Sequence, residues 1–137
     1  MSHQEHKVRL LSASGQIVEG VWVYDDELED CRLCLRYLDK EIVITEVDYF
    51  EAMCRIREEL EKKEFLPQCY GASKNVFPSG MSRSMGDGLQ AHRHRLGSKG
   101  TMSDLVSIFA TGEDVEAVTV AEQGRFHEEW LESISNP

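Results

Sequence analysis

Apolar residues, many of them β-branched or aromatic, form four runs in the stretch that ends at Val47. The first two runs, Lys7 to Ala13 and Ile17 to Tyr24, flank the turn sequence Ser-Gly-Gln. The other two, Cys31 to Leu38 and Glu41 to Val47, are joined by the polar dipeptide Asp-Lys. Runs of this kind, separated by short polar turns, are typical of β-hairpins. The pattern therefore predicts four antiparallel strands.

The apolar period becomes helical in the next stretch, from Asp48 to Glu64. Asp48 and Glu51 have the spacing of a capping box, in which each side chain hydrogen-bonds to the backbone N–H of the other residue. The charged residues of this stretch lie on the opposite side of the predicted helix. The apolar stripe consists of Phe50, Met53, Ile56 or the stem of Arg57, and Leu60. This pattern predicts an amphipathic helix.

Shorter apolar runs follow the Phe-Leu-Pro sequence that ends this helix. Gln68 to Ala72 predicts a short strand, and Leu105 to Ala110 predicts a buried strand. Thr119 and Glu122 form a second capping box, at the start of a helix near the C-terminus. The apolar positions of that helix are Phe126, Trp130, Leu131 and Ile134.

Together these elements predict an α+β fold, with an antiparallel sheet of four to six strands and two or three helices packed on one face. A chain of 137 residues without repeats or low-complexity linkers is expected to form a single domain, residues 1–137. No run is long and apolar enough to span a membrane, and the first residues lack the apolar core of a signal peptide. A cytoplasmic location is therefore expected.

The net charge of −10 disfavours binding to nucleic acid, because such binding depends on lysine and arginine that neutralise phosphates. The segment from Lys74 to Lys99 is an exception, since five basic residues and one aspartate give it a charge of +4. The rest of the chain therefore carries −14. Acidic residues are concentrated in Asp25 to Asp30 and in the stretch from Glu113 onward.

The four cysteines raise the question of a zinc site. Cys31 and Cys34 have the spacing of a zinc knuckle, and Cys54 and Cys69 would complete a set of four thiolates. However, Cys31 and Cys34 lie on a predicted strand, where residues three apart point to opposite faces. We therefore expect reduced, buried thiols, with no metal and no other cofactor.

The segment from Asn75 to Gly97 combines glycine, serine, arginine and histidine, and three interpretations of it compete. In the first, it binds an anion or serves a small enzyme, because backbone N–H groups near glycines and an arginine can surround a negative charge. Its glycine spacing matches neither the Walker pattern nor the dinucleotide fingerprint. The candidate residues are Ser79, Ser82, Arg83, His92 and His94.

In the second interpretation, His92 and His94 form a metal-binding or catalytic pair. Leu89 to Leu96 is predicted to be helical, and residues two apart on a helix point about 200° away from each other. In the third, which we favour, the segment is structural: Met81, Met85 and Leu89 form a core stripe of a helix that Gly97 caps. No residue is predicted to be catalytic.

An acidic chain of this kind favours a protein-binding function with a basic partner. With Asp-Asp-Glu-Leu-Glu-Asp on a hairpin connection and Glu-Glu-Trp-Leu-Glu near its end, the chain resembles small bacterial immunity proteins. The resemblance implies a protein that blocks a cognate toxin by occupying its active site. Neither a membrane nor a nucleic acid is an expected partner. The predicted contacts are two aromatic anchors and the loop carboxylates: Trp22, Tyr24, Asp25, Asp26, Glu27, Glu29 and Asp30.

Overall fold

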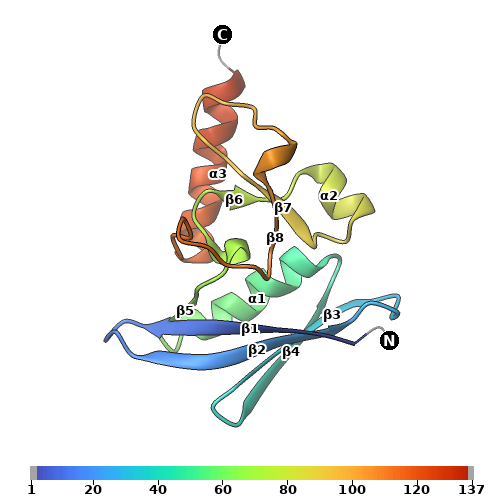
Figure 1. Cartoon of the computed structure of the whole chain (residues 1–137), viewed down its shortest axis with the longest axis vertical. Coiled ribbons are helices and arrows are strands. Elements are labelled where there is room, and N and C mark those ends of the chain that lie inside the picture. The colour runs from blue at the N-terminus through green and yellow to red at the C-terminus, as the bar shows by residue number, and fades with distance from the viewer. Residues whose placement is uncertain (1–2, 136–137) are drawn as a thin grey trace.

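The computed structural model describes residues 3–135, in which the first four strands and a fifth form one antiparallel sheet (Figure 1). The strand order is β4-β3-β2-β1-β5, and Leu10 lies opposite Val18 in the first hairpin. The four strands predicted before Val47 are confirmed. The strands are β1 (His3–Ser12), β2 (Ile17–Asp25), β3 (Cys31–Tyr37), β4 (Lys40–Glu46) and β5 (Phe65–Pro67).

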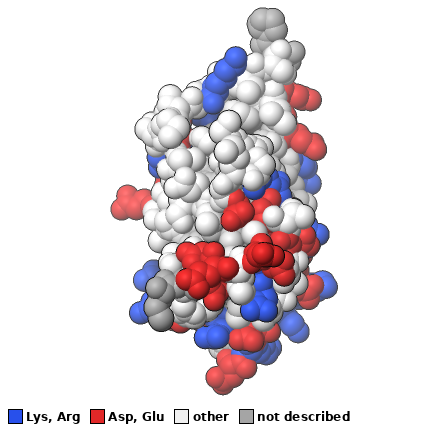
Figure 2. All heavy atoms as spheres, turned by 90° about the vertical axis from the view of Figure 1, so that its right-hand side faces the viewer, with Lys and Arg blue, Asp and Glu red and all other residues white. Residues whose placement is uncertain are grey.

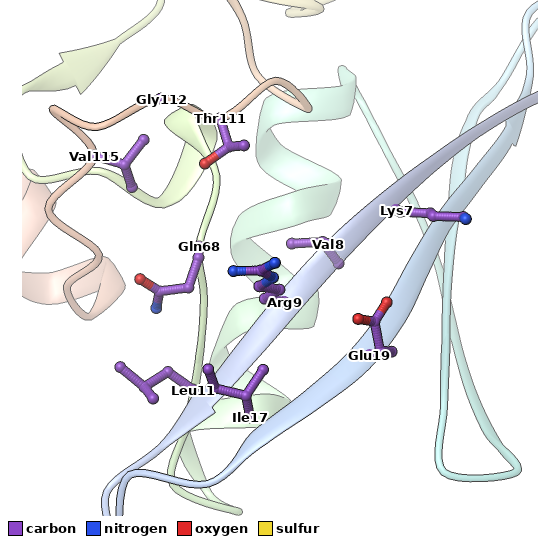
Figure 3. Close-up of a pocket in the computed structure, with 10 residues that line it drawn as sticks. All are labelled: Lys7, Val8, Arg9, Leu11, Ile17, Glu19, Gln68, Thr111, Gly112 and Val115. Carbon is purple, nitrogen blue, oxygen red and sulfur yellow. The ribbon is translucent and has the colours of Figure 1, made fainter.

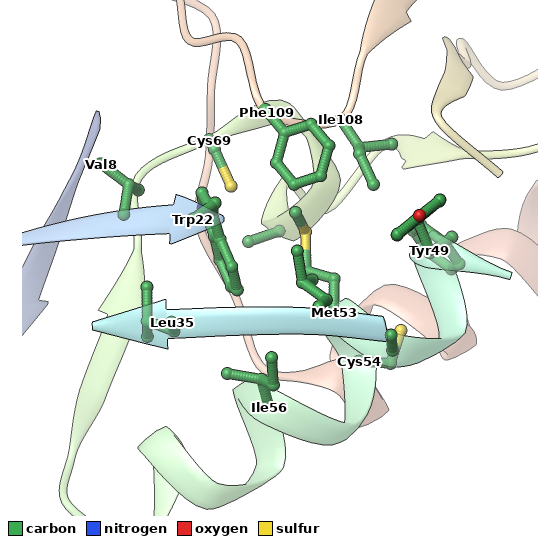
Figure 4. Close-up of a cluster of buried hydrophobic side chains, with 14 of the residues drawn as sticks. Val8, Trp22, Leu35, Tyr49, Met53, Cys54, Ile56, Cys69, Ile108 and Phe109 are labelled. Atoms are coloured by element: carbon green, nitrogen blue, oxygen red, sulfur yellow. The ribbon is translucent and has the colours of Figure 1, made fainter. Parts of the chain in front are cut away.

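One face of this sheet is apolar and is covered by helix α1 (Tyr49–Glu61). The side chains of Leu10, Trp22 and Leu35 are completely buried on that face, and Figure 4 shows Trp22 and Leu35 among their neighbours. Asp48 is the N-cap of α1, and its carboxylate accepts a hydrogen bond of 2.7 Å from the backbone N–H of Glu51. The carboxylate of Glu51 binds arginines instead of the backbone, so the predicted capping box is half formed.

The second half of the described chain builds a small separate sheet with the order β6-β7-β8. Its strands are β6 (Val76–Phe77), β7 (Gln90–Arg93) and β8 (Leu105–Ser107). Helix α3 (Val120–Ser135) packs against β6 and α1, and short helix α2 (Gly80–Met85) follows β6. Thr119 and Glu122 form the predicted capping box, since each backbone N–H donates to the side chain of the other residue.

Two of the secondary-structure predictions for this half were wrong. Leu89 to Leu96 is not helical, because its central residues form β7 between two partner strands. Gln68 to Ala72 is not a strand, because the extended residues are those of β5, and Tyr70–Ala72 forms a 3₁₀ turn. That turn passes so close to α1 that a Cβ atom on Gly71 would collide with Met53 and Ile108.

A buried polar joint connects α1 with α3. Arg57 is 1% exposed, and its guanidinium donates to the side-chain oxygen of Gln123 at 2.6 Å and to the carbonyl of Val118 at 2.9 Å. The amide nitrogen of Gln123 lies within 3.0 Å of the carbonyl oxygens of Gly71, Ser73 and Val76. Burial lowers the pKa of Arg57. Both of its Nη atoms donate hydrogen bonds, one of them also to the carbonyl of Gly71 at 3.1 Å, whereas its buried Nε has no partner among residues 3–135.

A continuous cluster of buried side chains runs through both sheets, from Leu10 and Trp22 to Val76 and Ala91. The α+β class is confirmed, with the strands divided between a five-stranded and a three-stranded sheet. Among residues 3–135, no helix is both long and apolar enough to cross a membrane.

Candidate functional site

The acidic connection, residues 25–30, is a turn that projects between β2 and β3. Residues 26–30 are all exposed, and the backbone folds back where the N–H of Leu28 donates to the carbonyl of Asp25 at 3.3 Å. Within the described part of the chain, four of its carboxylates form no ion pair: those of Asp26, Glu27, Glu29 and Asp30. Their charges therefore remain available to a partner in solution.

The two predicted aromatic anchors have different positions. Trp22 is completely buried, so its assignment as a partner contact was wrong. Alternate residues of a strand point to the same face of the sheet. Trp22 follows the buried residues Val18 and Gly20 at this spacing, so its side chain points to the α1 side. Tyr24 is half-buried and packs against Phe109 at a ring-centroid distance of 5.2 Å. Of the two predicted anchors, Tyr24 therefore lies partly at the surface, beside the acidic connection.

Arg83 of α2 is held by carboxylates of α1. Its Nε donates to Asp48 at 2.8 Å, and one of its Nη atoms donates to Glu51 at 3.1 Å. Ser79 is the N-cap of α2, and its hydroxyl accepts from the N–H of Ser82. Of the two candidate anion-binding serines, Ser79 thus caps α2 and Ser82 lies within it. The candidate Arg83 has two anionic partners within the protein.

His92 lies on β7 and His94 directly follows that strand, and their rings are stacked with centroids 6.1 Å apart instead of diverging as the predicted helix required. His94 stacks on Trp130 with a centroid distance of 3.7 Å, and His127 stacks on Phe77 at 3.8 Å. These five rings, defined here as the histidine layer, fix α3 against β6 and the end of β7. The sequence did not reveal the layer because His127 joins it from α3, three residues before Trp130.

The surroundings of two histidines of the layer, His94 and His127, favour neutral imidazoles. Burial, together with the charges of His127 and His92, lowers the pKa of His94 to about 4. Burial also lowers the pKa of His127, and its Nδ1 is buried without a hydrogen-bond partner among residues 3–135. Near neutral pH His94 and His127 therefore pack as uncharged aromatic groups.

The methionines of the segment do not belong to the core. Met81 is 72% exposed and Met85 is 81% exposed, so the predicted core stripe was wrong. Helix α2 ends at Met85, and Gly88, with a φ of +69°, turns the chain back toward Asp48. Gly97, predicted to cap a helix, lies in a turn where its N–H donates to the hydroxyl of Ser133.

The cysteines are free thiols on several elements. Cys31 faces the core, whereas Cys34 is half-buried on the opposite face of β3 beside Glu41. Burial raises the pKa of all four thiols to about 11, and we therefore expect them to be protonated near neutral pH. Over the described residues, no group of three or more histidine, cysteine or carboxylate side chains is arranged to hold a metal ion.

Several hollows in the surface are lined by charges of both signs, and two of them lie away from the acidic connection. The larger, about 700 Å³, lies between the β1–β2 hairpin and the 111–115 loop, where Lys7 and Arg9 are accompanied by Glu19 (Figure 3). The other, about 440 Å³, lies beside β7. There Arg93 is paired with Asp114 at 3.3 Å and donates to the carbonyl of Ser103. Neither hollow presents an excess of one charge comparable to that of the acidic connection.

No model of a known protein family matches the chain, and no curated protein sequence matches it either.

Proposed function

We propose that the chain is a protein-binding module that docks a basic partner on its acidic connection. The observation that carries this proposal is the set of four carboxylates without ion pairs among residues 3–135, on a turn held by two long strands. Charges already presented in this way attract an opposite surface with little loss of conformational entropy on binding. The resemblance to immunity proteins suggests that the partner is a toxin, which the module blocks by covering its active site.

The arrangement of the other charged groups supports binding in preference to catalysis. Arg83 is neutralised by Asp48 and Glu51, and Arg93 is paired with Asp114. His94 is buried and His127 is half-buried, and burial lowers the pKa of both. A general acid or base needs access to substrate and a pKa near the working pH, and these groups do not combine the two. The acidic connection has the access that a docking site requires.

The test begins with proteins recovered at low salt from the native host on the immobilised chain. The basic protein obtained is purified, and its association rate is measured with the wild type and with a variant in which Asp26, Glu27, Glu29 and Asp30 become the corresponding amides. We expect the variant to associate about tenfold more slowly or worse, because steering by opposite charge is lost. If the partner is a toxin, wild-type chain rescues the growth of cells that express it, and the variant does not.

A matched control removes the same charge elsewhere, by amide substitutions at Glu113, Glu128, Glu129 and Glu132. These carboxylates are exposed and form no ion pair within the described residues. The control is expected to associate within about twofold of wild type at moderate salt, where distant charges are screened. An equal decrease of the association rate in both variants would show an effect of total charge and would contradict a docking role for the connection. Failure to recover any basic protein would contradict it too.

A further inference from the structure

Four large apolar side chains are exposed near the acidic connection. Val47 and Met85 are each 81% exposed, Met81 is 72% exposed, and Leu28, within the connection itself, is 42% exposed. Met81 and Met85 are four residues apart on α2, so they project from the same side of the helix. Exposed apolar groups that are gathered together mark interaction surfaces more often than isolated ones do.

Three chain segments that carry these groups converge at Tyr49. The backbone N–H of Tyr49 donates to the carbonyl of Asp87, just beyond α2, at 2.7 Å. Its hydroxyl donates to the carbonyl of Asp25, at the start of the connection, at 3.5 Å. Burial, together with the neighbouring Cys31, Tyr24, Asp87 and Asp26, raises the pKa of Tyr49 to about 12. The end of α2 and the acidic connection are therefore neighbours around the start of α1.

Figure 2 shows this side of the molecule. The surface at the level of α2 is largely uncharged, and acidic side chains gather directly below it, at the level of the connection between β2 and β3. The uncharged surface of α2, which carries the exposed side chains of Met81 and Met85, is thus bordered by negative charge on one side. A complementary partner would place apolar side chains on the patch and cationic ones beside it.

Helix α2 is held with its methionines outward. Arg83, on the other side of the helix, is anchored to Asp48 and Glu51 of α1. The close approach of Gly88 to Asp48 leaves no room for a side chain, which fixes the return of the chain to α1. Exposure of Met81 and Met85 is therefore built into the fold. Methionine also suits a contact surface, because its flexible thioether adapts to the shape of a partner.

We infer that α2 and the acidic connection form one continuous docking surface for a cationic amphipathic segment of a partner protein. This inference rests on the proposed function and adds an apolar contact surface, on α2, to the acidic connection. Basic side chains of the segment bind Asp26, Asp30 and Asp87, and its apolar side chains cover Met81 and Met85. A purely basic segment would use the carboxylates alone.

The test uses two synthetic peptides of equal positive charge, one amphipathic with lysine and leucine at helical spacing, the other with lysine and serine. Methionine methyl groups labelled with ¹³C report on the patch, and backbone amides of residues 26–30 report on the connection. Met102 is a matched control, because it is 78% exposed on a different element. We expect the amphipathic peptide to shift the Met81 and Met85 methyl signals and the connection amides, but not Met102.

Substitution of both Met81 and Met85 by glutamine is expected to weaken binding of the amphipathic peptide about tenfold, whereas Met102→Gln has little effect. Binding of the lysine–serine peptide should be the same in all three proteins. Unshifted Met81 and Met85 signals, with shifted connection amides, would overturn this inference and leave the proposed function standing. If neither peptide shifts the amide signals of residues 26–30, the proposed function is contradicted as well. Equal shifts at Met102 would show nonspecific adsorption and would also overturn the inference.

Discussion

At the scale of single residues, Arg83 illustrates how a charge that suggests a ligand site can serve the fold. It stands in the most basic segment of the chain, yet its guanidinium lies between Asp48, which is 3% exposed, and Glu51. Removing one member of a largely buried pair leaves the other charge without compensation. The structural and the anion-binding interpretations therefore differ in what they predict for a protein without ligand.

We expect Arg83→Ala to lower the free energy of unfolding by about 1–3 kcal/mol with no anion present, because the buried carboxylate of Asp48 loses its partner. Urea denaturation followed by circular dichroism measures this loss. Arg95→Ala is the control, since Arg95 is exposed and forms no ion pair in the described range, and should change stability by less than about 0.5 kcal/mol. An unchanged stability for Arg83→Ala, together with thermal stabilisation of the wild type alone by phosphate, would support the anion site.

At the scale of elements, the histidine layer makes the attachment of α3 sensitive to acid. The pKa of His94 is about 4 in the folded protein, against an ordinary value of about 6.5. Between these values the unfolded chain binds more protons than the folded one, so stability rises with pH and is lost as pH falls. The groups around the layer act in both directions: His92 and Arg83 oppose protonation, and Asp104 and Glu128 favour it.

We expect the stability of the wild type to fall by up to about 1.4 kcal/mol per pH unit from His94 as pH decreases from 6.5 toward 4. His94→Phe keeps a ring that can stack on Trp130 but cannot titrate, so its stability profile should be flatter in that window. Chemical denaturation at several pH values measures both profiles. His3→Gln, which replaces an exposed histidine, is the control and should follow the wild type. Equal slopes for His94→Phe and wild type would refute a role for His94.

At the scale of the whole molecule, the joint of Arg57 and Gln123 links the large sheet and α1 to the small sheet and α3. Each side of the joint contains one tryptophan, Trp22 in the large sheet and Trp130 on α3. The long-range hydrogen bonds of Gln123 make the two parts depend on each other, because loss of this side chain leaves buried carbonyls and Arg57 with fewer partners.

Gln123→Ala should therefore cost about 2–4 kcal/mol of stability, against less than about 0.5 kcal/mol for Glu129→Ala at an exposed position of α3. Unfolding is followed by the fluorescence of single-tryptophan variants that retain either Trp22 or Trp130. In the otherwise wild-type protein the two probes should report the same transition. In Gln123→Ala we expect Trp130 to be exposed at lower denaturant than Trp22. A small loss with coincident transitions would rule out the joint as the link.

The whole fold also determines which charges of the chain are paired within the protein and which face the solvent. Two arginines of the basic segment are paired with the protein's own acidic residues, Arg83 with α1 and Arg93 with Asp114. Lys74 lies over the ring of Phe126 at 5.8 Å. Part of the positive segment is thus used within the fold, whereas the acidic connection remains open. The net charge of −10 is consequently presented to solvent unevenly.

The sequence by itself determined the elements that depend on near neighbours: the two hairpins before Val47, helix α1 with its cap at Asp48, and helix α3 with its capping box. Their turns, caps and apolar periods involve residues a few positions apart, which a sequence displays directly. The acidic connection was also visible, because its exposure follows from a run of carboxylates between two strands.

Tertiary structure alone decided the identity of β7, the burial of Trp22, the exposure of Met81 and Met85, and the assembly of the histidine layer. β7 exists because β6 and β8 satisfy its backbone hydrogen bonds, and local propensity says little about such distant partners. The side of the sheet that faces α1 likewise determined where Trp22 points. Arg83 found its carboxylates 32 and 35 residues earlier in the chain. Contacts across such separations depend on how the elements pack. Because of that packing, the segment predicted to be a basic helix contains the strand β7 and the exposed side chains of Met81 and Met85.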